Sequence, residues 1–179
     1  MWIKVLEDGL CNDYATKSRG IGSFLLTVGF ILSIYILFSP LSMPSILGIG
    51  LLFTGLFTGY FTAKMNPHVI ASWSKTLLIF LTGLFFLFVK VEPIHVSTIL
   101  GLFFTAGMVN NFYLAYLTRQ NTTAVAWSIH AVLSAYFAID TLFYADQLSL
   151  DSIALFVAIN LMADGLVVIY SGRKIFIRP

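Results

Sequence analysis

The sequence predicts an all-α polytopic membrane protein with six transmembrane helices, arranged as three tandem helical hairpins. Hydrophobic residues make up 59% of the chain and charged residues only 10%, whereas a soluble domain usually carries about 25% charged residues. The chain also repeats itself at a constant offset, from position 39 to 92 to 145. Ser39-Pro40 falls on Glu92-Pro93 and then on Ala145-Asp146, each time in a break between two apolar runs. A unit of helix, short turn and helix, copied three times, therefore accounts for most of the chain.

The six spans follow from the apolar runs, because a helix needs about 20 apolar residues to cross the hydrocarbon core. We expect them at residues 20–38, 44–64, 74–89, 95–117, 124–144 and 150–171. The repeats then cover about 20–66, 73–119 and 124–172, which together form one membrane domain of residues 20–172. Residues 1–19 are expected to be a separate cytoplasmic or interfacial segment, either a helix in the membrane plane or a loosely ordered tail. Residues 173–179 are expected to be a cytoplasmic tail.

The basic residues predict the orientation, because cytoplasmic flanks of membrane spans collect Lys and Arg. Nine fall on one side of the predicted topology and only Lys90 on the other; the nine are Lys4, Lys17, Arg19, Lys64, Lys75, Arg119, Arg173, Lys174 and Arg178. Both termini should therefore face the cytoplasm. Lys75 is the most deeply placed of the nine, and we expect it to extend toward the lipid headgroups.

Small residues predict where helices pack, because membrane helices associate through close contact rather than through the hydrophobic effect. The candidate packing residues are Gly48, Gly55 and Gly59 in the second span, and Gly101 and Gly107 in the fourth. These glycines have two possible packing partners. We favour other spans of the same chain; the alternative is a second copy of the chain in a homo-oligomer.

Polar side chains inside the spans are the candidates for chemistry. They are Asn110, Asn111, His130, Asn160 and Asp164. Counting residues from the outer turns puts His130, Asp164 and one of the two asparagines at the same depth, nearer the cytoplasmic leaflet than the midplane. Asn160 precedes Asp164 by one helical turn and shares its face. A carboxylate at this depth is costly unless it is paired or protonated, and the imidazole of His130 is a suitable partner.

This polar cluster has two interpretations. As a functional site it would be a proton relay or a site for a polar substrate. As a structural feature it would be a hydrogen-bonded contact that fixes how the hairpins pack. We favour the structural interpretation, because Thr58 and Asn111 occupy the positions of the first two repeats that match Asp164, and neither is ionisable. Asp140 lies close to the outer turn and is expected to reach water.

Other classes of site are not indicated by the sequence. Motifs for a serine nucleophile, a zinc protease, a phosphate loop and a cysteine pair are all missing from it, so we expect no enzyme activity and no cofactor. His68, His95 and His130 lie in three separate segments at different depths, so we expect no metal site. The formal net charge of +2 gives no indication of nucleic-acid binding. The single cysteine, Cys11, is expected to be an ordinary free thiol.

The repeat resembles the HdeD family of bacterial acid-resistance membrane proteins. The residues that carry the resemblance are Ser39-Pro40 followed by the run from Ile46 to Gly55, and Pro93 followed by the run from Ile99 to Gly107. In both copies a proline in the outer turn precedes a helix with two spaced glycines. The third copy departs from this pattern, because Asp146 replaces the proline and Asn160 the later glycine. The resemblance covers about residues 20–172 and implies a stress-associated inner-membrane protein, without implying any catalytic residue.

Three functions therefore remain. The favoured one is a non-enzymatic protein of the inner membrane that acts structurally, or as an interaction partner within the bilayer, in acid or envelope stress. Its partners would be the lipid bilayer and either further copies of the chain or a larger membrane complex. The alternative is a small permeation or transport unit for protons or small solutes, built on His130 and Asp164. An odd number of repeats argues against it, because many transporters use paired inverted halves. A membrane enzyme is the least supported.

Overall fold

The structure, a computed structural model, describes residues 2–38, 43–65, 70–88, 93–119 and 122–174. In this part of the chain the fold is all α, as predicted. The helices are α1 (Trp2–Phe38), α2 (Met43–Met65), α3 (Ile70–Phe88), α4 (Pro93–Leu117), α5 (Thr123–Phe143) and α6 (Leu150–Lys174), with a short 3-10 helix η1 (Ala145–Gln147) before α6. Ser39-Pro40, Glu92 and most of the tail at 173–179, which were part of the sequence predictions, lie outside the described residues.

Four of these helices contain a segment long and apolar enough to cross a membrane. The segments are Thr16–Ile36, His95–Leu117, Thr123–Phe143 and Leu150–Ser171. The described parts of α2 and α3 contain shorter apolar segments, Ser45–Tyr60 and Trp73–Phe88. The chain is therefore an all-helical protein whose helices are compatible with a membrane.

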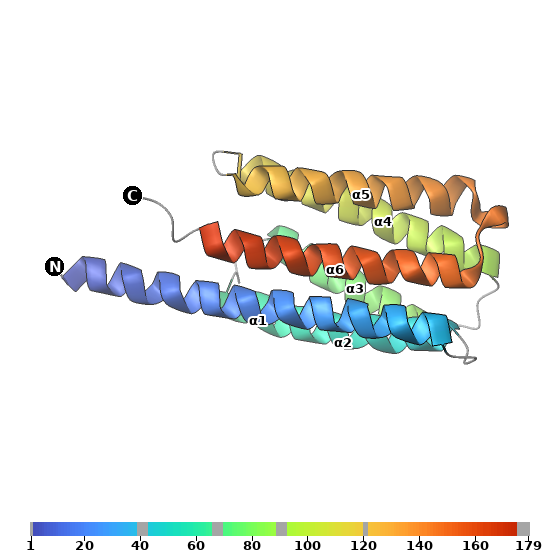
Figure 1. Ribbon diagram of the computed structural model, residues 1–179, viewed down its shortest axis with the longest axis horizontal. Helices are drawn as coiled ribbons and strands as arrows, with labels where there is room; N and C mark the ends of the chain where they lie inside the picture. Colours follow the sequence, from blue (N-terminus) through green and yellow to red (C-terminus); the bar gives the residue numbers. More distant parts are fainter. Residues whose placement is uncertain (1, 39–42, 66–69, 89–92, 120–121, 175–179) are drawn as a thin grey trace.

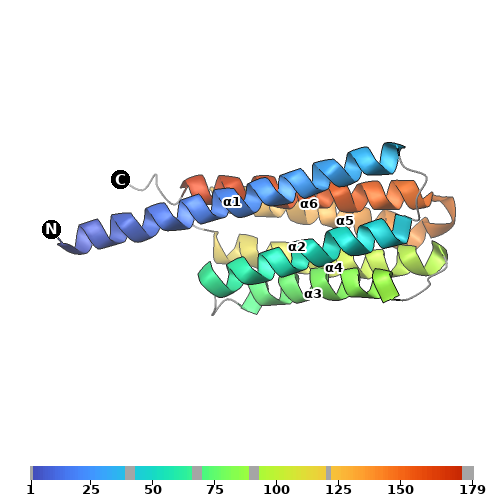
Figure 2. The ribbon, with the colours of Figure 1, turned by 90° about the horizontal axis from the view of Figure 1, so that it is seen from below.

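The N-terminal segment is helical. α1 runs unbroken from Trp2 to Phe38, so residues 2–19 are continuous with the first apolar segment, Thr16–Ile36. Figures 1 and 2 show the N-terminal part of α1 continuing along the same direction beyond the rest of the bundle. The helix continues past residue 19 because the sequence contains no helix-breaking residue there, and the cytoplasmic or interfacial placement of residues 1–19 stays a prediction. Gly20 and Gly22 lower helix propensity without ending a helix.

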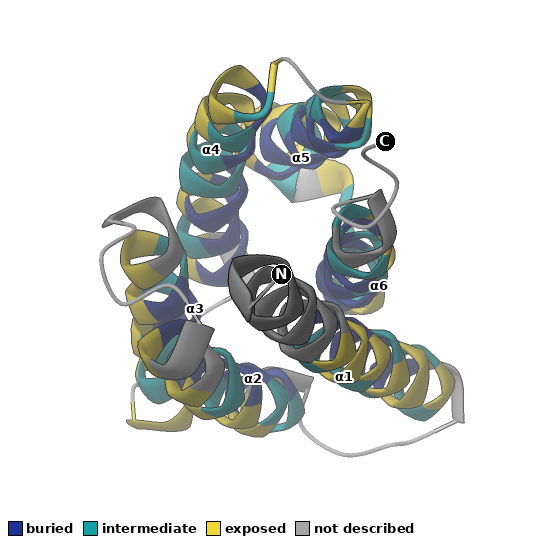
Figure 3. Ribbon diagram, turned by 90° about the vertical axis from the view of Figure 1, so that its left-hand side faces the viewer, coloured by how far each residue is buried: buried dark blue, intermediate teal, exposed yellow. Residues whose placement is uncertain are grey.

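The six helices form a ring, and each runs antiparallel to the next (Figures 1 and 3). The first helix, α1, lies against the last, α6, and closes the ring. The most extensive packing is between α1 and α6, between α4 and α5, and between α2 and α3. Each of these pairs joins the second helix of one repeat to the first helix of another. The two helices of a single hairpin pack against each other less extensively.

Apolar side chains fill the interior of the ring toward the end at which α1 leads into α2. Among the most deeply buried, at most 2% exposed, are Leu47, Leu51, Leu100, Phe104, Ile153, Val157 and Leu161. Large apolar side chains also cover the outside, among them Phe88 and Phe143 at 81% and 77% exposure. A surface of this kind is suited to contact with lipid.

The predicted glycines of α2 lie where two backbones come closest. A Cβ on Gly48 would lie 2.9 Å from a side-chain carbon of Leu87 in α3, and one on Gly55 would lie 2.7 Å from the Cα of Phe80. A Cβ on Gly59 would lie 3.1 Å from Thr76. These three glycines therefore form a seam between α2 and α3 within one chain.

The two glycines predicted in α4 behave differently from each other. A Cβ on Gly101 would lie 2.5 Å from Leu142 and 3.1 Å from the hydroxyl of Thr141, so Gly101 belongs to the contact between α4 and α5. A Cβ on Gly107 would meet nothing within 4 Å. Gly107 therefore takes no part in close packing within this chain, because no neighbouring helix approaches α4 at that position.

Three further close contacts were not predicted from the sequence. Gly22 and Gly29 of α1 face α6, where added Cβ atoms would lie 2.5 Å from the carbonyl oxygen of Gly165 and 2.7 Å from that of Ala158. Gly83 of α3 faces α2 opposite Gly48. The closest helix pairs of the ring therefore all use glycine, and α1 and α6 are held as closely as neighbours in sequence.

Candidate functional site

Six polar side chains from four helices meet inside the bundle, in the half nearer the N-terminus of α1. We call this group the polar layer; it consists of Lys75 of α3, Asn111 of α4, His130 and Ser134 of α5, and Asn160 and Asp164 of α6. All except Lys75 are at most 5% exposed. His130 and Ser134 lie one turn apart on α5, and so do Asn160 and Asp164 on α6. Each pair therefore presents its side chains on one face of its helix.

Asp164 is the centre of the layer. Its Oδ1 atom accepts a hydrogen bond from the ammonium of Lys75 and lies 3.0 Å from Nδ1 of His130, which donates to it. Asp164 is 1% exposed, and a buried carboxylate is costly unless an opposite charge or donors compensate it. Lys75 supplies the opposite charge, and the imidazole supplies a second donor.

The placement of Lys75 corrects the expectation that it extends toward the lipid headgroups. Its ammonium pairs with Asp164 and lies 5.6 Å from the centre of the Trp127 ring, while its side chain remains 20% exposed. The reason is physical: a carboxylate buried at this depth offers a cation a stronger interaction than the hydrated interface does.

The ion pair between Lys75 and Asp164 spans the interior of the ring. α3 and α6 lie on different sides of it and do not otherwise pack extensively against each other (Figure 3). The pair therefore connects two helices that the glycine seams leave apart.

The second ring nitrogen of His130 faces α6. Nε2 lies 3.2 Å from Oδ1 of Asn160, and the same oxygen lies 3.0 Å from Oγ of Ser134. Ser134 also lies 3.0 Å from the main-chain carbonyl oxygen of His130, one turn earlier in α5, and can donate its single proton to it. Both nitrogens of the imidazole are therefore engaged while the residue is 2% exposed.

Asn111 joins the layer from α4. Its amide nitrogen lies 3.4 Å from Oγ of Ser134 and 3.2 Å from Nδ1 of His130, and its amide oxygen is buried without a hydrogen-bond partner. A half-turn of this amide would place the oxygen where both Nδ1–H and the serine hydroxyl can donate to it. The neighbouring Asn110 also has a buried amide nitrogen without a partner.

The structure brings four of the five predicted polar residues into one network: Asn111, His130, Asn160 and Asp164. Asn110 lies outside it. It precedes Asn111 in α4, and successive residues of a helix point about 100° apart around the helix axis; its amide nitrogen has no hydrogen-bond partner. Sequence reasoning missed Lys75 and Ser134. Ser134 carried a usable signal, since it follows His130 by four residues and shares its face. Lys75 carried none, because only the fold brings α3 opposite α6.

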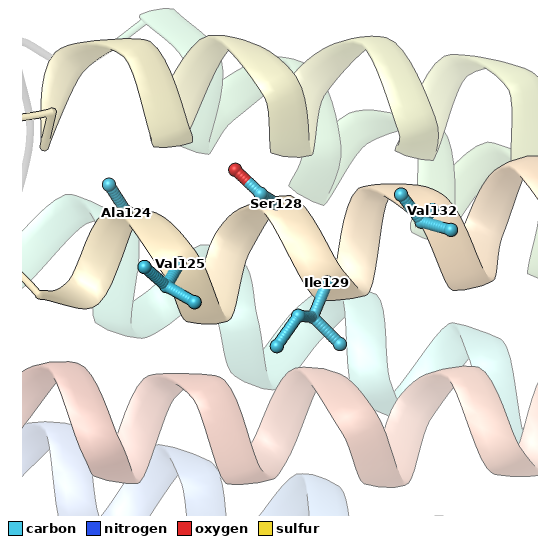
Figure 4. A pocket seen from close by; sticks show the side chains of 5 residues that line it. All are labelled: Ala124, Val125, Ser128, Ile129 and Val132. Carbon is cyan, nitrogen blue, oxygen red and sulfur yellow. The ribbon is translucent and has the colours of Figure 1, made fainter.

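Two further features belong to the described part of the chain. The described residues contain no group of three His, Cys, Asp or Glu side chains arranged to hold a metal ion. A shallow apolar groove lies along α5, lined by Ala124, Val125, Ser128, Ile129 and Val132 (Figure 4). None of these five residues belongs to the polar layer, so the groove is not part of the site.

Comparisons of the chain with protein-family models, with curated proteins and with solved structures find no match. The resemblance to the HdeD family therefore rests on the repeated proline and glycine residues alone.

Proposed function

We propose that this chain is a six-span protein of the bacterial inner (plasma) membrane, with both termini in the cytoplasm, that acts without catalysis as a structural or interaction component. One observation carries the proposal: the buried charges of the bundle neutralise each other inside it. Asp164 pairs with Lys75, and the rest of the polar layer is uncharged apart from the titratable His130. A layer built in this way fixes the helices relative to one another, which is what a scaffold requires.

The six-span topology is supported by the equivalence of the repeats. α2 and α3 lie side by side with helices that are long enough to cross a membrane, and they run antiparallel to them (Figure 2). The basic residues described at the polar-layer end, Lys17, Arg19 and Arg119, favour the cytoplasm for that end. The resemblance to HdeD-type proteins favours a role in acid or envelope stress.

Reporter fusions test the topology. A green fluorescent protein fused after Pro179 should fluoresce, because it would remain in the cytoplasm, and an alkaline phosphatase inserted at Ala145–Gln147 should be active, because it would be exported. Alkaline phosphatase activity from the C-terminal position, or fluorescence from the insertion in η1, would contradict the orientation.

A second candidate function is the passage of protons or small solutes, because Lys75, Asp164 and His130 form a continuous hydrogen-bonded series in which the carboxylate of Asp164 joins two proton donors. The apolar core is the argument against it. Leu51, Leu100 and Phe104 are fully buried beyond the layer, and the buried hydroxyls of Thr54 and Thr141 donate to carbonyl oxygens of their own helices rather than to the layer. The scaffold is therefore the better supported function.

A flux assay separates the two candidates. The purified protein is reconstituted into liposomes that contain a pH-sensitive dye, and proton entry is measured at acid and at neutral pH. The scaffold predicts flux equal to that of protein-free liposomes, and a lower thermal stability for Asp164→Asn. Proton flux that Asp164→Asn abolishes would favour the permeation unit instead.

Partners within the bilayer are the other part of the proposal. The outer surface of α4 and α5 is apolar and aromatic, with Val109, Tyr113, Ile129 and Val132 each at least 50% exposed. Such a surface suits lipid, further copies of the chain or another membrane protein equally well. Solubilisation in mild detergent, followed by measurement of the mass and composition of the purified particle, distinguishes a monomer from a homo-oligomer and from a larger complex.

A further inference from the structure

His130 is the one titratable side chain of the polar layer whose charge the ion pair does not account for. It lies inside the bundle at 2% exposure, with Nδ1 facing Asp164 at 3.0 Å and Nε2 facing Asn160 at 3.2 Å. The imidazole group titrates between about pH 5 and about pH 8 in proteins, unlike other unperturbed side chains. Whether a buried imidazole can change its charge depends on whether its neighbours can satisfy both forms.

The charged form is satisfied once the Asn111 amide is turned as described above, so that its oxygen and not its nitrogen lies 3.2 Å from Nδ1. Nδ1–H donates to Oδ1 of Asp164, and Nε2–H donates to Oδ1 of Asn160. Ser134 donates its proton to the main-chain carbonyl oxygen of His130 at 3.0 Å. No donor of the imidazolium is then left without an acceptor.

The neutral form is satisfied after one small change, a half-turn of the Asn160 amide. Nε2 then accepts a hydrogen bond from the amide nitrogen of Asn160, which comes to lie where the oxygen was. The second proton of that nitrogen points to Oγ of Ser134, 3.0 Å from the same position. Ser134 can accept it, because its own proton is donated elsewhere. Nδ1–H still donates to Asp164.

We propose that the polar layer is a proton-binding site: Nε2 of His130 takes up a proton from solvent and releases it again, and the Asn160 amide turns to follow. The bond that forms is Nε2–H, and the bond that breaks is an O–H bond of hydronium. A proton needs no cavity, so the filled interior is compatible with this ligand. The inference goes beyond the proposed function, because a scaffold does not require a group that changes charge.

The charges around the ring are consistent with both forms. The ionisable groups near His130 in the described structure are Asp164 from α6 and Lys75 from α3, which together are neutral. α4 contributes the uncharged Asn111, and α5 contributes Ser134. Protonation gives the layer one positive charge, held 3.0 Å from a carboxylate oxygen. Lys75 is the most exposed member of the layer, and the site is therefore nearest to solvent on its side.

Nitrogen-15 NMR of the protein in lipid bilayers tests the proposal. The protein is labelled at histidine and asparagine nitrogens and measured at several values from about pH 5 to about pH 8. His130, assigned through His130→Gln, should change from one protonated ring nitrogen to two as the pH falls, and the Asn160 amide signals should shift over the same range. Free imidazole added to the buffer reports that the pH change took place.

Two results overturn the proposal. One is a His130 ring that keeps the same protonation over the whole range while free imidazole in the buffer changes its protonation. The other is a His130 ring that titrates while the Asn160 amide signals stay fixed. Neither result depends on the flux assay, so the proton site and the proposed scaffold can fail separately.

A pair of variants sharpens the test. Asn160→Leu removes the group that serves both forms and should leave less imidazolium at about pH 5 than the unmodified protein has, because a buried N–H would then lack an acceptor. Asn110→Leu removes an amide of the same size outside the network and should leave the titration unchanged. Circular dichroism checks that both variants keep their helices. Equal titration of His130 in both variants would contradict the role of Asn160.

Discussion

The close contact between α1 and α6 allows a quantitative prediction, because a glycine of each helix lies against the backbone of the other. A Cβ added to Gly165 would lie 2.5 Å from the carbonyl oxygen of Gly22 and 2.9 Å from the backbone nitrogen of Leu26. Ordinary contact begins at 3.4 Å, so the two backbones would have to separate by about 1 Å, which a close-packed interior resists. Gly165→Ala should therefore lower the free energy of unfolding by about 1–3 kcal/mol, the usual cost of overpacking.

The matched control is Gly107→Ala, which introduces the same methyl group into another long helix. A Cβ at Gly107 would meet nothing within 4 Å. Replacing a helical glycine by alanine favours the helix by about 0.5–1 kcal/mol, so this variant should be unchanged or slightly more stable. Because the gain in helix propensity applies to both substitutions, the two variants should differ by the cost of overpacking alone, at least about 1 kcal/mol.

The assay is reversible unfolding in mixed micelles of a mild detergent and sodium dodecyl sulfate, followed by circular dichroism. Gly22→Ala provides an independent check, because its Cβ would lie 2.5 Å from the carbonyl oxygen of Gly165 across the same seam. The double variant should lose less stability than the sum of the two single variants, since one separation of the helices relieves both clashes. Equal stabilities of Gly165→Ala and Gly107→Ala would refute the close packing of α1 on α6.

Two further predictions concern the ion pair and the apolar core. Asp164→Leu should lower the free energy of unfolding by about 3–5 kcal/mol, because it leaves a partly buried ammonium without its partner. Adding Lys75→Met should recover at least about 1 kcal/mol of that stability. Strictly additive effects of the two substitutions in the same unfolding assay would argue against the pair. Phe104→Ala should cost about 3–5 kcal/mol, because Phe104 is fully buried. Phe143→Ala at the 77% exposed position should change stability by less than about 0.5 kcal/mol; similar losses at the two positions would mean that Phe104 does not lie in the core.

The positions of the helices could be read from the sequence with good accuracy. The last four spans, expected at 74–89, 95–117, 124–144 and 150–171, match α3 to α6 within four residues at each end. The reason is that apolar length and turn residues act locally. Pro93 begins α4, where a missing backbone N–H has no consequence. The sequence did not show that the first helix extends back to Trp2, because the polar residues before Thr16 interrupt the apolar pattern without ending the helix.

The pairing of helices could not be read from the sequence in the same way. A repeat of two helices suggests that the hairpin is the packing unit, but the closest contacts join neighbouring repeats and close the ring through α1 and α6. Small residues indicated which faces pack closely, as at Gly48 and Gly55, without indicating the partner. The choice of partner depends on the shape of two surfaces that lie far apart in the chain, and spacing within one helix carries no information about it.

The partner of Asp164 was hidden for a related reason. Depth could be counted along a single hairpin, and this placed His130 at the level of Asp164, at a distance that the structure gives as 3.0 Å. Lys75 belongs to another repeat and reaches Asp164 across the ring, so counting within the last hairpin could not find it. A basic residue five or six positions into a helix can extend outward or inward with equal ease. Only the position of the carboxylate decides between the two.

The polar layer also shows where the three repeats cease to be equivalent. Thr58, Asn111 and Asp164 occupy the same position in α2, α4 and α6. Thr58 donates to the main-chain oxygen of Thr54 in its own helix at 2.8 Å, whereas Asn111 contacts α5 and Asp164 contacts both α3 and α5. The residue at this repeated position therefore bonds within its own helix in the first repeat, contacts one other helix in the second and contacts two other helices in the third. A role shared equally by three repeats, such as a symmetric pore along the ring axis, would need the same chemistry in each. The ion pair and the imidazole of the polar layer instead involve only the second and third repeats, so the layer is asymmetric. Any specific function within the membrane should therefore depend on the contact of the third repeat with α3.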